Sequence, residues 1–288
     1  MRTNEDHLVQ IAVMGEISPP SLSAPYRPDA SGQARVMYGM AGIAYNVRVG
    51  DPAFGWEADH LEPGVSIHNR DLEADYAMHY LTCVGNEATV ATGDACGAKG
   101  VVSGEHARLL IDFAADVLDR MCIGDRMVIK THGVGLQLLQ YPHITVRKCS
   151  PRLIEAMGLE HGAGGTLRVP VTHEIPSQIM GSGLELIPEF VDQDLMTEDR
   201  TLMEELGLTD LRLGDVVAIR DQDHSHGRGY SSGATTIGLI NHGDSFMTGH
   251  GPGVMTLLSC PTPHIEPFIE PEANIAKYLR IGRWSEER

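Results

Sequence analysis

The stretch from Leu208 to Ser259 constrains the fold most, because it combines β-prone runs with histidines that stand beside glycines. His226 and His242 each precede a glycine, and His250 lies between two. Glycine accepts positive φ and lets the backbone approach a ligand closely, so polar side chains can converge at such positions. We therefore interpret this stretch as strands and loops that carry a binding or catalytic site.

A second feature is a local motif that occurs twice, in Leu118–Lys130 and in Leu208–Arg220. In both segments a Gly-Asp pair follows an apolar residue and precedes a β-branched run. The physical sense is a turn in which glycine takes the strained φ and aspartate caps backbone N–H groups before a strand. Two such turns favour two small β-barrel or sandwich-like units, although the similarity is too short to prove a duplication.

The rest of the chain consists of β-prone runs bounded by Gly, Pro and Asp, without long helices between them. This pattern favours a mainly β or α+β fold with a few short helices. A Gly-rich stretch at 162–165 marks a linker, so we expect an N-terminal domain at 1–165 and a C-terminal domain at 166–288. We also expect an extended arm at 1–30, a tight loop at Gly93–His106, and helices at 112–121, at 151–160, within 193–206 and near the C-terminal end.

Charge and cysteine spacing limit the partners and the compartment. The 288-residue chain has a formal charge of −17, which argues against nucleic acid and anionic membrane surfaces because both are polyanions. No apolar run approaches the ~18 residues of a membrane span, and the acidic, polar start is unlike a signal peptide. The five cysteines are far apart, without a CxxC pair. We expect five reduced thiols in a cytoplasmic protein, and neither a disulfide framework nor a thiolate zinc site.

Several phrases together resemble a known family: GDACGAKGVVSGEH, IGDRMVIKTHGVGL, IPSQIMGSG, LRLGDVVAIRDQDHSHGRGY, TTIGLINHGDS and GHGPGV. The chain resembles, from about Val36 to Arg283, an uncharacterised prokaryotic family of unknown function. The C-terminal half of that family is described as a barrel-sandwich hybrid domain. The resemblance implies a β-barrel or sandwich architecture and a cytoplasmic location, and it implies no activity.

Four histidines are the candidate metal ligands: His224, His226, His242 and His250. Histidine together with carboxylate suits a divalent ion such as zinc or manganese. Along a strand, His224 and His226 would point to the face opposite Asp221 and Asp223, so both pairs serve one metal only if the segment is a loop. A solvated hairpin turn is the alternative interpretation of this segment.

The candidate general bases are Asp223 and Glu105, and Arg228 is the candidate anchor for a substrate carboxylate. We expect further ligand contacts from both halves of the chain: Gly249, Gly251, Gly253, His132, Asp94 and Lys99. No phosphate-loop, dinucleotide, serine-elbow or HExxH motif is present. These residues predict a metal-assisted hydrolase or lyase acting on a small polar metabolite, such as an amide or cyclic amide.

The alternative is a non-catalytic small-ligand-binding or structural β-barrel protein, in which the histidines merely occupy turns. Either way the expected partner is a small molecule, with a homo-oligomer left open. The site hypothesis makes a geometric prediction. His226, Arg228, His242 and His250 should converge in a concave region that faces the Gly93–His106 loop or His132.

Overall fold

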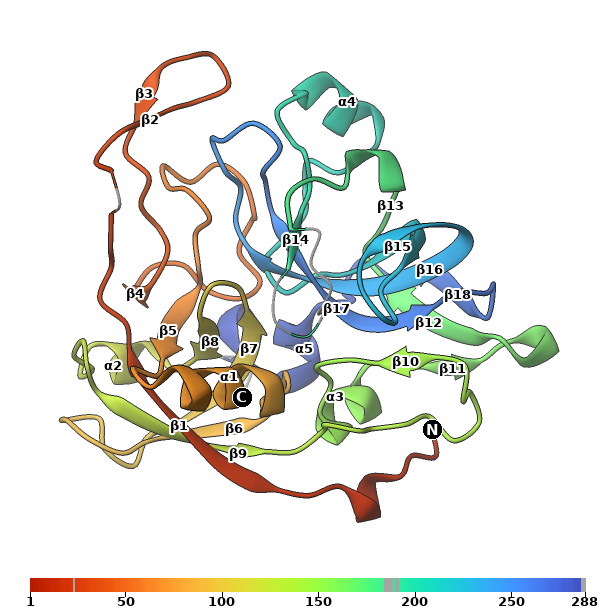
Figure 1. The fold of residues 1–288 in the computed structure, drawn as a ribbon, viewed down its shortest axis with the longest axis horizontal. Helices are drawn as coiled ribbons and strands as arrows, with labels where there is room; N and C mark the ends of the chain where they lie inside the picture. The colour runs from red at the N-terminus through yellow and green to blue at the C-terminus, as the bar shows by residue number, and fades with distance from the viewer. Residues whose placement is uncertain (23, 184–188, 190–191, 286–288) are drawn as a thin grey trace.

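The computed structural model describes residues 1–22, 24–183, 189 and 192–285 of the chain. Its architecture is mainly β, as predicted, with a strand-built body in each half of the sequence. In Figure 1 the red-to-yellow strands of the first half lie beside the cyan and blue strands of the second. The two-stranded hairpin of β2 (Arg27–Pro28) and β3 (Ala34–Arg35) projects away from both.

The first half contains a closed, six-stranded antiparallel barrel. In barrel order its strands are β1 (Ile11–Ile17), β9 (Arg126–Thr131), β6 (Glu87–Val90), β7 (Lys99–Glu105), β8 (Leu109–Asp112) and β5 (Gly64–His68). The ring closes because β1 pairs with β9 through Ile11 to Glu16 and with β5 through Glu16 and Ile17. A short strand, β4 (Gly42–Ala44), extends the sheet from β5.

Alternating side chains explain why these segments form a barrel. Along β9 every second residue is buried, and the inward-facing Met127 and Ile129 are fully enclosed. They pack with Ile67, Leu109 and other apolar side chains in a core that fills the barrel. Burial of an aliphatic side chain of this kind contributes about 1.5–3 kcal/mol. Because side chains alternate between the two faces of a strand, the face that carries the apolar residues turns to the inside of the barrel.

The second half forms two sheets. The larger has the order β10 (Thr145–Val146), β17 (Gly253–Cys260), β16 (Gly229–His242), β15 (Val216–Asp223) and β13 (His173–Ile175), and β14 (Gln193–Asp194) also pairs with β17. The smaller contains β11 (Glu160–His161), β12 (Leu167–Val171) and β18 (Ile265–Ile269). All eight residues of β17 are buried, so this strand runs through the interior between its neighbours.

The predicted Gly-Asp turns are confirmed. Gly124 and Gly214 have φ values of +88° and +87°, where a side chain would be strained. The following Asp125 accepts a hydrogen bond from the backbone N–H of Cys122, and Asp215 accepts the equivalent bond from Arg212. Strands β9 and β15 begin directly after the two turns. The same local chemistry therefore starts one strand in each half.

The helices are short. They are α1 (Leu72–Leu81), α2 (Ala115–Leu118), α3 (Pro151–Ala156), α4 (Arg200–Glu205) and α5 (Ile275–Leu279), with 3₁₀ turns at Glu5–His7, Ala163–Gly165, Ser177–Ile179 and Gly282–Trp284. Ser150 caps α3 by accepting from the N–H of Leu153, with Pro151 in the first turn, as predicted. None of these helices is long and apolar enough to cross a membrane, in the part of the chain that the structure describes.

Two expectations about local structure were wrong. The Gly93–His106 segment is a loop only up to Ala98, because β7 then pairs with β6 and β8. The N-terminal 30 residues are not a free arm, since β1 completes the barrel. In both cases long-range strand pairing outweighed local sequence preference. The helix expected within 193–206 is present, because α4 spans Arg200–Glu205 and follows β14.

Candidate functional site

Four histidines and two aspartates gather around one cavity. His60 lies in the segment before β5, His106 follows β7, His242 ends β16, and His250 lies in the loop between β16 and β17. The ring centroids of His106 and His242 are 4.1 Å apart, and those of His60 and His250 are 5.1 Å apart. Asp192, just before β14, contacts the ring of His242, and Asp194, within β14, contacts the rings of His60 and His250.

Strand pairing at one glycine explains the convergence. In the register of the larger sheet, Gly253 on β17 faces Asp194 of β14 on one side and His242 of β16 on the other. A Cβ atom added at Gly253 would lie 1.9 Å from Oδ2 of Asp192 and 2.2 Å from Nε2 of His242. Only a residue without a side chain fits here, so the glycine at position 253 is what lets the acidic and imidazole groups meet.

Each of the three central histidines has its Nδ1 atom engaged by an oxygen. His60 Nδ1 lies 2.6 Å from Oδ2 of Asp59, and His106 Nδ1 lies 2.8 Å from Oε1 of Glu62. His242 Nδ1 is 2.8 Å from the carbonyl oxygen of the next residue. Metal-binding histidines show this arrangement, because a bond at one ring nitrogen orients the ring and leaves the other nitrogen for the metal.

The outer carboxylates are themselves held firmly. Glu62 accepts hydrogen bonds from the hydroxyl of Ser66 and the backbone N–H of Ala41. Asp59 accepts from the hydroxyl of Ser245 and the backbone N–H of Phe246. The orientation of His60 and His106 is therefore fixed through a second layer of bonds. His60 also has a φ of +48°, a costly conformation that tertiary contacts must maintain.

At the centre, His242 Nε2 lies 2.8 Å from Oδ2 of Asp192 and 3.4 Å from Oδ1 of Asp194. These contacts are short, yet Nε2 is buried and no hydrogen bond of acceptable alignment reaches it. The other oxygen of Asp194, Oδ2, lies 2.7 Å from Nδ1 of His250 and 3.3 Å from Nε2 of His60. A buried imidazole nitrogen without an aligned hydrogen bond, surrounded by carboxylate oxygens, is an arrangement that a bound cation would explain.

The charges of this cluster depend on one another. Burial alone would lower the pKa of His242, but Asp192 and Asp194 outweigh it and hold that pKa well above its ordinary value. Burial would likewise raise the pKa of Asp192, whereas positive charge on His106 and His242 lowers it to about 2. The acidic groups thus require positive charge nearby, from protonated imidazoles or from a metal ion.

Two overlapping sets of ligand atoms lie within 4.8 Å of one another: His60, Asp194 and His242, and His106, Asp192 and His242. Imidazole nitrogen with carboxylate oxygen suits zinc, manganese and related divalent ions. Beside these sets is a cavity of about 280 Å³, lined by His60, His106, Ala107, Ser182, Gly183, Asp192, Asp194 and His250. The arrangement can therefore hold a metal ion next to space for a small molecule.

The structure brings together part of the predicted constellation. His242 and His250 meet, and the 93–106 segment supplies His106 at its end. Gly253 borders the cluster as the close-packed position described above. Gly249 does not present a free N–H group as expected. The N–H of Gly249 donates to Glu198, and Gly251 packs against Leu195 and Thr197 of the neighbouring segment.

The hairpin between β15 and β16 holds its polar residues away from this cluster. His224 is fully buried, and its Nδ1 lies 2.9 Å from the hydroxyl of Thr256. Asp223 accepts hydrogen bonds from Ser225 and Ser259. His226 is exposed at the turn. The grouped ligand atoms and the cavity lining include none of the three hairpin residues, among the described parts of the chain.

Glu105 and Arg228 support the site without lining its cavity. The carboxylate of Glu105 is buried and lies 2.5 Å from Nζ of Lys148. Its backbone oxygen accepts from Asn241, whose amide also donates to Asp192 over 3.1 Å. Arg228 donates from Nη1 to the backbone oxygens of Gly183 and Asp192, both over 2.6 Å. These two residues therefore hold the backbone beside the cluster.

The three remaining candidates lie elsewhere. His132 lines a separate pocket with Lys130 and Arg152. Lys99, at the exposed start of β7, pairs with Glu87, and Asp94 is exposed in the preceding turn. The opposite wall predicted for the site is thus His106 and Ala107, and not His132.

Sequence reasoning missed His60, Asp192 and Asp194 as site residues. His60 stands in the run Asp59-His60-Leu61-Glu62, where alternating acidic residues beside a histidine were the available signal. Asp192 and Asp194 had only a polar surrounding to mark them, and Asp194 fell in the segment 193–206, within which we expected a helix. Their role depends on pairing with Gly253, which is 59 residues from Asp194 and has no local signature.

The comparisons with known proteins agree with this architecture. Two family models match: the N-terminal domain of unknown function DUF4438 over residues 26–155, and its C-terminal counterpart over 156–279. The solved crystal structure of the protein TM1086 is similar, with a TM-score of 0.92 and 41% sequence identity over 96% of this chain and 99% of that one. The comparison with curated proteins finds no match. The chain belongs to the DUF4438 family.

Proposed function

We propose that the protein is a metal-assisted hydrolase or lyase that acts on a small polar metabolite, such as an amide or cyclic amide. One observation carries the proposal. Three histidines, each oriented at Nδ1 by an oxygen, meet two buried aspartates beside a cavity. A set of this kind is costly to bury, because the desolvated charges must be balanced, and it has no packing advantage over apolar side chains.

The ligands in this proposal are His60, His106, His242, Asp192 and Asp194, and the ion is zinc or manganese. The sequence-based ligand set contained His224 and His226. We now propose His60 and His106 in their place, because the rings of these two residues lie beside that of His242. A divalent ion, when bound, polarises a carbonyl group and lowers the pKa of a bound water. The protein supplies the orientation, through Asp59, Glu62 and the carbonyl of Gly243.

His250 is suited to proton transfer at the mouth of the cavity. Its side chain is 24% exposed, compared with 12% for His106, 9% for His60 and 0% for His242, so among the four histidines His250 combines the greatest solvent access with a carboxylate partner. Asp194 faces its Nδ1 at 2.7 Å and leaves Nε2 for a substrate or a water. We prefer this pair to Asp223 and Glu105 as general base, since those two carboxylates do not line the cavity.

Metal content tests the proposal. We would purify the untagged protein and measure bound metals in the wild type and in His242→Ala, Asp192→Asn and His226→Ala. His242→Ala and Asp192→Asn should each lose one equivalent. His226→Ala is the matched control, because it removes an exposed histidine outside the cluster. Equal metal content in all four proteins would contradict the assignment.

Activity is tested separately, with small amides and cyclic amides and with metal-stripped and reloaded protein. His250→Ala should lower kcat while it retains the metal. If the ion binds but neither hydrolysis nor elimination occurs, the alternative of non-catalytic small-ligand binding gains support. The cavity of about 280 Å³ suits a small ligand in either case. We further propose a cytoplasmic location, in which the cysteines stay reduced.

A further inference from the structure

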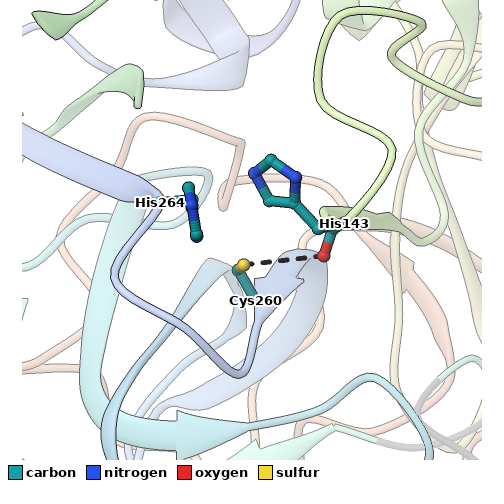
Figure 2. Close-up of side chains that lie close together, drawn as sticks. All are labelled: His143, Cys260 and His264. Atoms are coloured by element: carbon teal, nitrogen blue, oxygen red, sulfur yellow. Dashed lines mark hydrogen bonds between the residues drawn. The ribbon is translucent and has the colours of Figure 1, made fainter. Parts of the chain in front are cut away.

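A second cluster of ligand side chains lies at the other end of β17. His143, Cys260 and His264 each offer a ligand atom, and these atoms lie within 4.8 Å of one another. In Figure 2 the sulfur of Cys260 lies near both imidazole rings and is joined by a hydrogen bond to the backbone oxygen of His143. The ring centroids are 4.1 Å apart, with a tilt of 52°. The group shares no residue with the cavity described above.

The fold explains how these residues meet. Cys260 is the last residue of β17, and His264 comes just before β18. Strand β10 pairs with β17 so that Thr145 faces Ser259, which places the preceding His143 beside the end of β17. Two of the ligands thus come from one turn, and the third comes from a segment more than a hundred residues away.

The hydroxyl of Thr262 provides an independent indication of a ligand site. It lies 2.8 Å from Nδ1 of His264 and 3.4 Å from the sulfur of Cys260. A bond at Nδ1 orients the His264 ring and leaves Nε2 as the coordinating atom, as in histidines that bind metals. Cys260 is fully buried, His264 is half-buried and His143 is exposed, so the sulfur forms the base of a site that opens to solvent.

We propose that His143, Cys260 and His264 bind a zinc ion through one thiolate and two imidazoles. Sulfur and nitrogen donors suit zinc, which takes four ligands, and water completes the set. Binding forms a Zn–S bond and displaces the thiol proton of Cys260 to solvent, without any change of oxidation state. The ion cross-links the segment before β10 to the turn between β17 and β18.

Our sequence-based exclusion of a thiolate zinc site considered only pairs of cysteines. One cysteine with two histidines escapes that test, since the His143 ligand is remote in sequence. The thiolate also separates this site from the candidate centre, because no sulfur is among the grouped ligand atoms there. The two sites therefore have different spectroscopic signatures.

Cobalt(II) tests the proposal in the full-length protein. After chelation of resident metals, added cobalt(II) chloride should produce a near-ultraviolet sulfur-to-cobalt charge-transfer band with one equivalent bound. Cys260→Ser should abolish the band. Cys122→Ser, at an exposed cysteine, is the matched control and should retain it. Absence of the band in the wild type, or an equal band in Cys260→Ser, overturns the proposal.

A second variant covers the case in which Cys260→Ser does not fold. His264→Ala alters a half-buried surface turn and should weaken cobalt(II) binding by at least about tenfold, as followed by titration of the same band. Zinc sulfate should displace the cobalt and bleach the band in the wild type. Unchanged affinity in His264→Ala, or failure of zinc to compete, contradicts a zinc site made by these three residues.

Discussion

His224 and His242 are both fully buried in the larger C-terminal sheet, yet their environments are opposite. His224 follows β15, its Nδ1 faces the hydroxyl of Thr256, and burial together with the charge of Arg228 lowers its pKa to about 3. At His242, burial acts in the same direction, but two carboxylates outweigh it and raise the pKa. Burial of a histidine alone therefore does not indicate a metal site. The group beside the ring, a hydroxyl at His224 and two carboxylates at His242, separates the two cases.

The same contrast separates the hairpin from the candidate centre. In the hairpin, Asp223 accepts hydrogen bonds from the hydroxyls of Ser225 and Ser259. In the centre, Asp192 and Asp194 contact the rings of His60, His242 and His250, which come from three separate segments. The polar residues of the hairpin thus bond to hydroxyl groups of the hairpin and of β17, whereas the centre joins imidazole and carboxylate groups from separate segments.

The largest expected effect comes from Gly253→Ala in the centre. The new Cβ would press into Asp192 and His242, at 1.9 and 2.2 Å, so the strands or the side chains must move. We expect a loss of stability of about 3 kcal/mol, within the range for overpacking, and loss of bound metal. Chemical denaturation and metal analysis check both. If Gly253→Ala kept both its metal and its full stability, Asp192 and His242 would not be packed as closely against Gly253 as these distances indicate.

Acid stability distinguishes the two histidines. The folded pKa of His224 is below its unfolded value, so the unfolded state binds the proton first and stability falls as the pH drops below about 6.5. At pH 5 this amounts to about 2 kcal/mol. His224→Gln should remove that part of the pH dependence, as measured by urea unfolding between pH 7 and pH 5.

His242 should show the opposite sign in metal-free protein. Its folded pKa is raised, so its stabilising contribution is fully present below about pH 6.5 and is lost as the pH rises through the folded value. His242→Gln should therefore lose stability at pH 6 and lose less at high pH. The same pH trend for both variants would contradict the comparison.

Removal of an outer carboxylate should have a moderate effect. Glu62→Gln replaces the negatively charged partner of His106 with a neutral one of the same shape, so metal affinity should fall by about tenfold or more. Asp223→Asn is the matched change in the hairpin and should leave metal affinity unaltered. Competition with a chromophoric chelator measures both, and equal losses would show that the hairpin does contribute to the centre.

The smallest expected effect is that of His226→Ala. The side chain is exposed at the hairpin turn, so the stability should change by no more than about 0.5 kcal/mol. Thermal unfolding at neutral pH checks this. A larger loss of stability would mean that the His226 side chain has a binding partner in solution, and His226 would again be a candidate metal ligand.

Local features of the fold could be predicted from the sequence. The Gly-Asp turns depend on two adjacent residues, and the start of α3 depends on Ser150 and Pro151. The mainly β class followed from short β-prone runs between turn residues. His242 and His250 were identifiable because each stands beside glycine at the end of, or between, β-prone runs.

The rest of the site could not be predicted, because it depends on pairing over long distances in the sequence. His60 contacts Asp194 across 134 residues, and Asn241 reaches Glu105 across 136. Strand β14 has only two residues, too few for any periodicity. Its position is decided by hydrogen bonds to β17, which a single sequence does not reveal.

Strand β17 has a further consequence, since Gly253 begins it at one proposed metal site and Cys260 ends it at the other. Seven steps along an extended strand span about 23 Å. Electrostatic screening acts over about 8 Å at physiological salt, so charge placed at one end is weakly felt at the other. The two ions would therefore load independently, and a titration with both metals should resolve as the sum of two non-cooperative binding curves.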